Sequence, residues 1–176
     1  MFLKKLINQI DKFAECTGKL MGWLSIIVVL LMAAIVVLRY AFNIGSIALQ
    51  ESVIYFHSAV FLLGSAYTLK HNEHVRVDLF YAKFSARGKA WVNLLGSLLL
   101  LLPVSVFILV MSWSFVLDSW QIMEASNEAG GLPFIYILKS FIPLFCLFLI
   151  IQAVAEAGKA WLIIKAGPSP INGDKL

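Results

Sequence analysis

The stretch LMGWLSIIVVLLMAAIVVL, residues 20–38, decides the fold class because it holds 19 consecutive residues without a charge. At 1.5 Å per residue, a helix of this length spans the roughly 30 Å hydrocarbon core of a bilayer. A cleaved signal peptide is the alternative, but the run is longer than the usual apolar part of one, and no small-x-small cleavage site follows it. We therefore predict a transmembrane helix over 20–38.

Three more apolar runs follow, over 52–69, 90–117 and 134–155. With 61% apolar and only 14% charged residues, the chain has too little polar surface to cover a water-soluble globule. The run 90–117 is longer than a bilayer needs, so we expect it to tilt or protrude, and Pro103 should kink it. The sequence predicts one all-α membrane domain, residues 1–176, with four transmembrane helices.

The two ends of the chain differ from these spans. In residues 1–18, apolar side chains recur at helical spacing while lysine and acidic side chains occupy the other face. This pattern is typical of an amphipathic helix that lies along the membrane interface. Residues 166–176 contain glycine and two prolines, which indicates a flexible tail.

The basic residues predict the topology. Twelve of the 14 lysines and arginines lie in the amino-terminal segment, the loop after the second span or the carboxyl-terminal segment, which leaves Arg39 and Lys139 on the opposite side. Because such residues concentrate on the cytoplasmic side of membrane proteins, we predict that both termini are cytoplasmic. The basic residues sit beside apolar segments, so membrane lipid explains the net charge of +4 better than nucleic acid does.

Three charged residues fall at similar depth near the outer face. Arg39 ends the first span, Glu51 begins the second, and Lys139 lies near the start of the fourth. They can form a polar cluster or contact a partner; alternatively, Arg39 and Lys139 snorkel to the interface while Glu51 favours a helix amino terminus. Pro143 removes the hydrogen bond to the carbonyl of Lys139, which supports the cluster.

The loop before the fourth span, called the outer loop below, ends in Gly130-Gly131-Leu132-Pro133. The two glycines permit a tight turn, and Pro133 falls where the first turn of a helix tolerates proline. No phosphate-binding or nucleophile motif surrounds these residues. We interpret the four as a structural turn.

The loop after the second span contains His74, Arg76 and Asp78 among aliphatic residues. Metal binding is one interpretation, but the loop lacks any established ligand spacing. We favour a structural or interface role, in which Arg76 and Asp78 hydrogen-bond to helix ends while their aliphatic neighbours dip into the membrane interface or a partner.

His57 is the only histidine inside a predicted span. A bis-histidine haem needs a second histidine on a facing helix, which favours a packing role for His57. No acidic residue lies in the middle of a span, so an ion or proton relay is missing, and a self-sufficient small exporter is the weakest alternative. We expect no enzyme activity, no metal and no cofactor.

Taken in order, five motifs carry a family resemblance: Arg39-Tyr40, Gln50-Glu51, Leu63-Gly64-Ser65-Ala66-Tyr67, His74-Val75-Arg76-Val77-Asp78, and Gly130-Gly131-Leu132-Pro133 followed by Lys139 and Ile142-Pro143. Most of the chain thereby resembles the small membrane subunit of tripartite ATP-independent periplasmic (TRAP) transporters, the DctQ-like family, in the branch labelled for mannitol or chloroaromatic transport. The chain departs in Leu49, where tryptophan is frequent, and in Asn127-Glu128-Ala129, where Asp-Pro often precedes the glycines.

The resemblance implies a multi-pass protein of the bacterial inner membrane that braces a large multi-spanning subunit and helps to dock a periplasmic substrate-binding protein. It further implies symport of organic acids, with sodium coupling in the large subunit. The alternative function is the haem-binding membrane anchor of a respiratory oxidoreductase, with His57 as a ligand.

Overall fold

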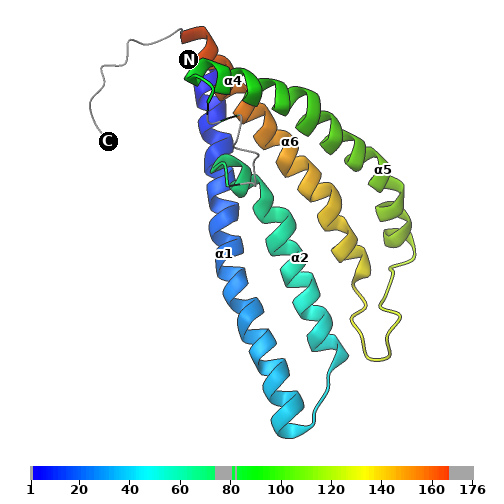
Figure 1. The fold of residues 1–176 in the computed structure, drawn as a ribbon. Coiled ribbons are helices and arrows are strands. Elements are labelled where there is room, and N and C mark those ends of the chain that lie inside the picture. The colour runs from blue at the N-terminus through cyan, green and yellow to red at the C-terminus, as the bar shows by residue number, and fades with distance from the viewer. Residues whose placement is uncertain (1, 74–80, 82, 167–176) are drawn as a thin grey trace.

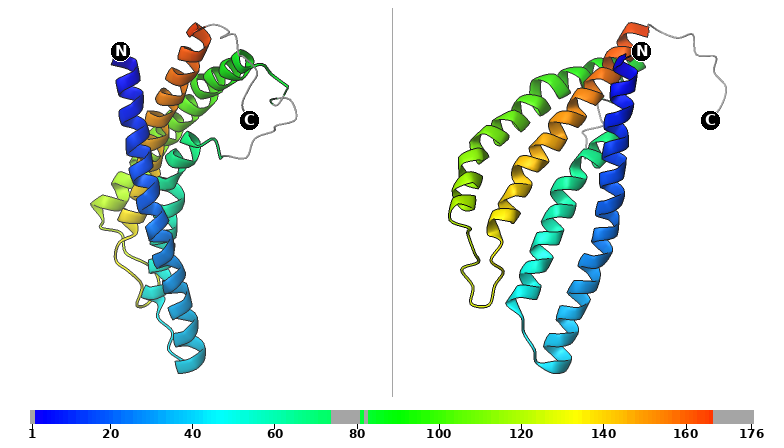
Figure 2. Two further views of the ribbon diagram at one scale, coloured as in Figure 1. Left: turned by 90° about the vertical axis from the view of Figure 1, so that its left-hand side faces the viewer. Right: turned by 180° about the vertical axis from the view of Figure 1, so that it is seen from behind.

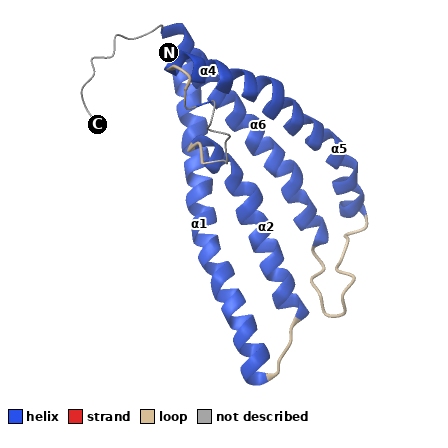
Figure 3. Ribbon diagram, in the orientation of Figure 1, coloured by secondary structure: helices blue, strands red, loops and turns tan. Residues whose placement is uncertain are grey.

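The computed structural model describes residues 2–73, 81 and 83–166, and every regular element in these ranges is a helix (Figures 1 and 3). The elements are α1 (Phe2–Phe42), α2 (Ile47–Lys70), α4 (Ala86–Leu95), the π-helix η1 (Gly96–Leu101), α5 (Leu102–Gln121) and α6 (Ile135–Ala166). Because α4, η1 and α5 are continuous, the chain has four helices long and apolar enough to cross a membrane. The predicted four-span, all-α fold is confirmed.

The four spans lie side by side in one twisted layer, in the order α1, α2, α6, α5 (Figures 1 and 2). Contacts join α1 to α2, α2 to α6 and α6 to α5, and α6 also touches α1 and α4. In α6, 28% of the most apolar window is buried, against 6–11% in the other spans, which identifies α6 as the central helix. The layer leaves most apolar side chains exposed on its two broad faces.

The layer is tightest at the end where α1 begins and α6 ends (Figure 1). There the small side chains of Ala90, Ala157 and Ala160 form a buried cluster with Leu94 and Ile164. Small residues let helix backbones approach closely, which is the main source of packing energy between helices in lipid. The opposite end, which carries the α1–α2 and α5–α6 loops, spreads apart.

Helix α1 differs from the expected pair of segments. We expected an interfacial helix over 1–18 separate from the span 20–38, whereas α1 runs unbroken through Lys19. Ile7, Ala14 and Met21, seven residues apart, are all buried, so one apolar stripe continues across the expected break. This stripe packs on other helices of the chain, and at about 62 Å the helix is longer than the hydrocarbon core is thick.

The irregularity expected at Pro103 lies just before it. Over Gly96–Leu101 the helix widens into a π-helix, and the N–H of Leu102 donates to the carbonyl of Ser97, five residues earlier. Pro103 stands in the first turn of α5, directly after this widened turn. The other observed bounds extend the predicted spans: α2 begins at Ile47, capped by Ser46, and α6 continues through Pro143 to Ala166. Most of the expected tail lies outside the described residues.

Candidate functional site

Glu51, in the second turn of α2, binds the outer loop with both carboxylate oxygens. Oε2 accepts a hydrogen bond from the backbone N–H of Leu132 at 2.6 Å, and Oε1 accepts one from the hydroxyl of Ser126. The N–H of Ser126 in turn donates to the carbonyl of Leu132 at 3.1 Å, which closes the loop on itself. One carboxylate thus joins the start of α2 to both sides of the turn in the outer loop.

The two glycines of this turn are required for different reasons. Gly130 has a φ of +81°, which an L-residue adopts only at a cost. Gly131 has an ordinary φ, but a Cβ there would lie 2.4 Å from the hydroxyl of Ser126 and 2.8 Å from Oε1 of Glu51. The Glu51 contact therefore exists only because residue 131 has no side chain.

Lys139, in the second turn of α6, binds the other end of the same loop. Its Nζ lies 2.5 Å from Oε2 of Glu124 and 3.9 Å from the centroid of the Phe115 ring on α5. The carbonyl of Glu124 also accepts from the N–H of Ile135 at 3.1 Å. The hydrogen bond from the Lys139 ammonium lowers the pKa of Glu124 below its ordinary value of 4.5, so Glu124 is ionised at neutral pH.

Trp120 completes the connection between α5 and α6 at this end. Its indole N–H donates to the hydroxyl of Ser140 at 2.8 Å, and its ring packs edge-on against Tyr136 with centroids 4.7 Å apart. Together with Glu51 and Lys139, this contact fixes the outer loop to three helices.

Of the three expected cluster residues, the structure brings two to one loop. Glu51 and Lys139 hold opposite ends of the outer loop, without a bond between them among the described residues. Arg39 lies apart, exposed at the end of α1 beside Ser46 and Gln50, and takes part in none of the ion pairs within residues 2–73, 81 and 83–166.

A second polar network, which sequence reasoning missed, joins the helices near the termini. Lys159 of α6 lies 2.8 Å from Asp11 of α1 and 2.7 Å from Glu156, and the amide of Gln152 donates to both carboxylates. The signal was present: Gln152, Glu156 and Lys159 recur at positions i, i+4 and i+7 of an apolar run, so they share one helix face.

The α1–α2 pair has a polar contact of its own at the same end. Glu15 lies 2.5 Å from the ammonium of Lys70 and 3.1 Å from Nε2 of His71. The His71 ring also packs against Tyr67, with centroids 4.4 Å apart. This contact lies at the carboxyl-terminal end of α2, where the cation of Lys70 is also favoured by the helix dipole.

The remaining predicted residues are not part of the site formed by Glu51, Lys139 and the outer loop. His74, Arg76 and Asp78 lie outside the described residues. His57 is exposed on α2. Within the described ranges, no group of three or more histidine, cysteine or acidic side chains is placed to hold a metal ion. The contacts of Glu51 and Lys139 among the described residues position a loop.

Comparison with known proteins identifies the family. Residues 27–162, well over half of the chain, match the family described as tripartite ATP-independent periplasmic transporters, DctQ component. The chain belongs to the DctQ family. No curated protein and no solved structure gives a significant match.

Membership has three direct consequences. The chain is a multi-pass membrane protein, and it is a transport subunit rather than an enzyme. As a DctQ component it is part of a tripartite system. The match stops at the level of the family, and it gives no support to the mannitol or chloroaromatic branch or to the haem-anchor alternative.

Proposed function

We propose that this DctQ component braces the large membrane subunit of a TRAP transporter in a bacterial inner membrane, for the uptake of organic acids. In this proposal the large subunit carries the substrate and couples to sodium, and this chain holds the large subunit's fixed part in the bilayer. The supporting observation is the family match over residues 27–162. In this proposal, substrate specificity lies mainly in the large subunit and the substrate-binding protein.

The shape of the chain suits a brace. A compact four-helix bundle encloses a core between its helices, which can hold a site, whereas a single layer of helices has no interior. Here only α6 is substantially buried, and both faces of the layer expose long apolar side chains. One broad face can therefore cover a larger membrane protein while the other faces lipid.

We further propose that the outer loop helps to dock the periplasmic substrate-binding protein. The loop exposes Asn127 and Glu128, and it is held by Glu51 and Lys139 rather than left free. A loop that is already ordered loses little conformational entropy on binding, so its contacts contribute more to affinity.

Uptake by the assembled transporter tests this role for the outer loop. We expect Glu51→Gln and Lys139→Met to lower uptake at least about twofold, because each releases one end of the loop. Lys12→Met and Lys165→Met remove cations at the other end of the molecule and serve as matched controls. Equal effects of all four substitutions would contradict the proposed role of the loop.

A further inference from the structure

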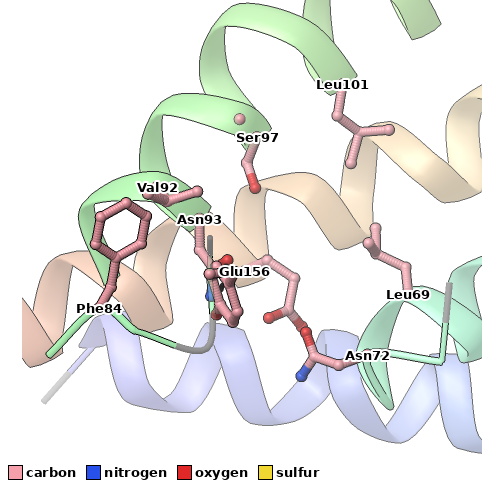
Figure 4. A pocket seen from close by; sticks show the side chains of 10 residues that line it. Leu69, Asn72, Phe84, Val92, Asn93, Ser97, Leu101 and Glu156 are labelled. Atoms are coloured by element: carbon pink, nitrogen blue, oxygen red, sulfur yellow. Dashed lines mark hydrogen bonds between the residues drawn. The ribbon is translucent and has the colours of Figure 1, made fainter. Parts of the chain in front are cut away.

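A groove opens where α2 ends, between α2 and the α4–η1 segment, with α6 as its floor (Figure 4). Its volume is about 420 Å³. The lining changes character along its length: Asn72, Asn93 and Glu156 are polar, whereas Leu69, Val92 and Leu101 are apolar. The groove thus runs from the polar helix ends into the apolar part of the third span.

Glu156 gives the groove an excess of negative charge. Its Oε1 accepts a hydrogen bond from the amide of Gln152 at 3.0 Å and another from the ammonium of Lys159 at 2.7 Å. The same ammonium donates to Oδ1 of Asp11 at 2.8 Å. Two carboxylates therefore share one ammonium. Among the described residues, no donor is bonded to Oε2 of Glu156, whose side chain lies beside the groove (Figure 4).

Ser97 provides an independent sign of a ligand. Its side chain is only 8% exposed and points into the groove from η1, and within the described part of the chain its hydroxyl has no hydrogen-bond partner (Figure 4). The hydroxyls of Ser65 and Ser140, by contrast, bond to carbonyls of their own helices. A hydroxyl without a bond, on a residue as little exposed as Ser97 and in a π-helical turn, is the kind of feature that recurs at binding sites.

We propose that this groove binds one phospholipid with a primary-ammonium headgroup, of which phosphatidylethanolamine is the example. The ammonium contacts Oε2 of Glu156 and the hydroxyl of Ser97, and one acyl chain lies along Leu69, Val92 and Leu101. The bound lipid would fill the space between α2 and α4 and so complete the packing of the layer at this end.

The chemistry of the lining favours this headgroup over two others. A primary ammonium has N–H donors for a carboxylate and a hydroxyl, whereas the trimethylammonium of phosphatidylcholine has none. Phosphatidylglycerol carries a negative charge, which the carboxylate of Glu156 repels. Tyr81 also lines the groove, and the ammonium of Lys89 lies 5.4 Å from the centroid of its ring. A cation is therefore available near the phosphate of the proposed lipid.

Native mass spectrometry of the full chain, titrated in mild detergent with each of the three lipids, tests the proposal. We expect one phosphatidylethanolamine per chain, with the other two lipids binding about tenfold more weakly. Glu156→Gln should reduce phosphatidylethanolamine binding to that level, and Glu128→Gln, a substitution in the outer loop, should leave binding unchanged.

A steric variant keeps the test independent of the Asp11–Lys159 network. Gly96 lines the groove, and a Cβ there would meet nothing within 4 Å, so Gly96→Leu is chosen to occupy part of the groove. It should abolish lipid binding, while Gly22→Leu, at an equally open position on α1, should not. Unchanged binding in Gly96→Leu would overturn the proposal, as would equal binding of all three lipids. Soluble phosphoethanolamine that binds as tightly as the lipid would overturn the acyl-chain contact and with it the lipid assignment.

Discussion

At the scale of single residues, Glu51 stabilises the outer loop through contacts that only the folded chain brings together. Its partners Ser126 and Leu132 lie 75 and 81 residues further along the chain, so no local pattern could name them. The sequence placed Glu51 and Lys139 near the same outer face because topology alone brings helix ends to similar depth. It could not show that the two bind opposite ends of one loop and that Arg39 lies elsewhere.

We predict that Gly131→Ala disrupts the Glu51 contact. The added methyl would lie within 2.8 Å of both Ser126 and Glu51, so the turn must move, at a cost of about 1–3 kcal/mol. Hydrogen exchange should show faster exchange of the Leu132 amide. Gly45→Ala is the matched control, because a Cβ there meets nothing within 4 Å. An unchanged exchange rate in Gly131→Ala would refute this account of the turn.

The Glu124–Lys139 pair predicts a pH dependence of the outer loop. Because the pKa of Glu124 is lowered in the folded chain, the pair stabilises the loop above pH 4.5 and is lost as the pH falls through the lowered value. The protection of residues 122–134 against hydrogen exchange, measured relative to the intrinsic rate at each pH, should therefore fall in acid in the wild type. Lys139→Met should exchange faster already at neutral pH and respond less to acid; an equal acid response in both proteins would contradict the assignment.

At the scale of elements, the four spans could be predicted because each apolar run is long and uncharged. The continuity of α1 could not be predicted, because the amphipathic pattern of residues 1–18 is the same for a helix that lies on lipid and for one that packs on protein. The deciding contacts are tertiary: Ile7 packs beside Gly158 of α6, and Gly18 lies against Tyr67 of α2.

We predict that Gly18→Ala destabilises the α1–α2 pair. A Cβ at Gly18 would lie 2.2 Å from Cδ2 of Tyr67, so the helices must separate or the ring must move, at a cost of about 1–3 kcal/mol. Thermal unfolding in detergent, followed by circular dichroism, should show a lower Tm. Gly22→Ala, four residues along the same helix with open space around its Cβ, should be neutral or stabilising because alanine favours helix. Equal Tm values for both variants would rule out the close contact.

At the scale of the whole molecule, the arrangement of the helices in one layer is what the sequence left open. In water, an apolar stripe shows which face of a helix is buried, but in lipid a side chain that faces a bilayer is as apolar as one that faces protein. The exposed faces of α1 and α5 therefore carry no signal that distinguishes lipid from a partner. A structure was needed to show that α6 is the most buried span and that it contacts each of the other three.

Co-purification tests whether this layer of helices braces a larger membrane subunit. The chain should be expressed together with the large membrane subunit of its TRAP system and purified through a tag on either protein in mild detergent. We predict a stable one-to-one complex whichever protein carries the tag. Recovery of the tagged chain alone, folded and monodisperse while the large subunit is present in the same membranes, would contradict it.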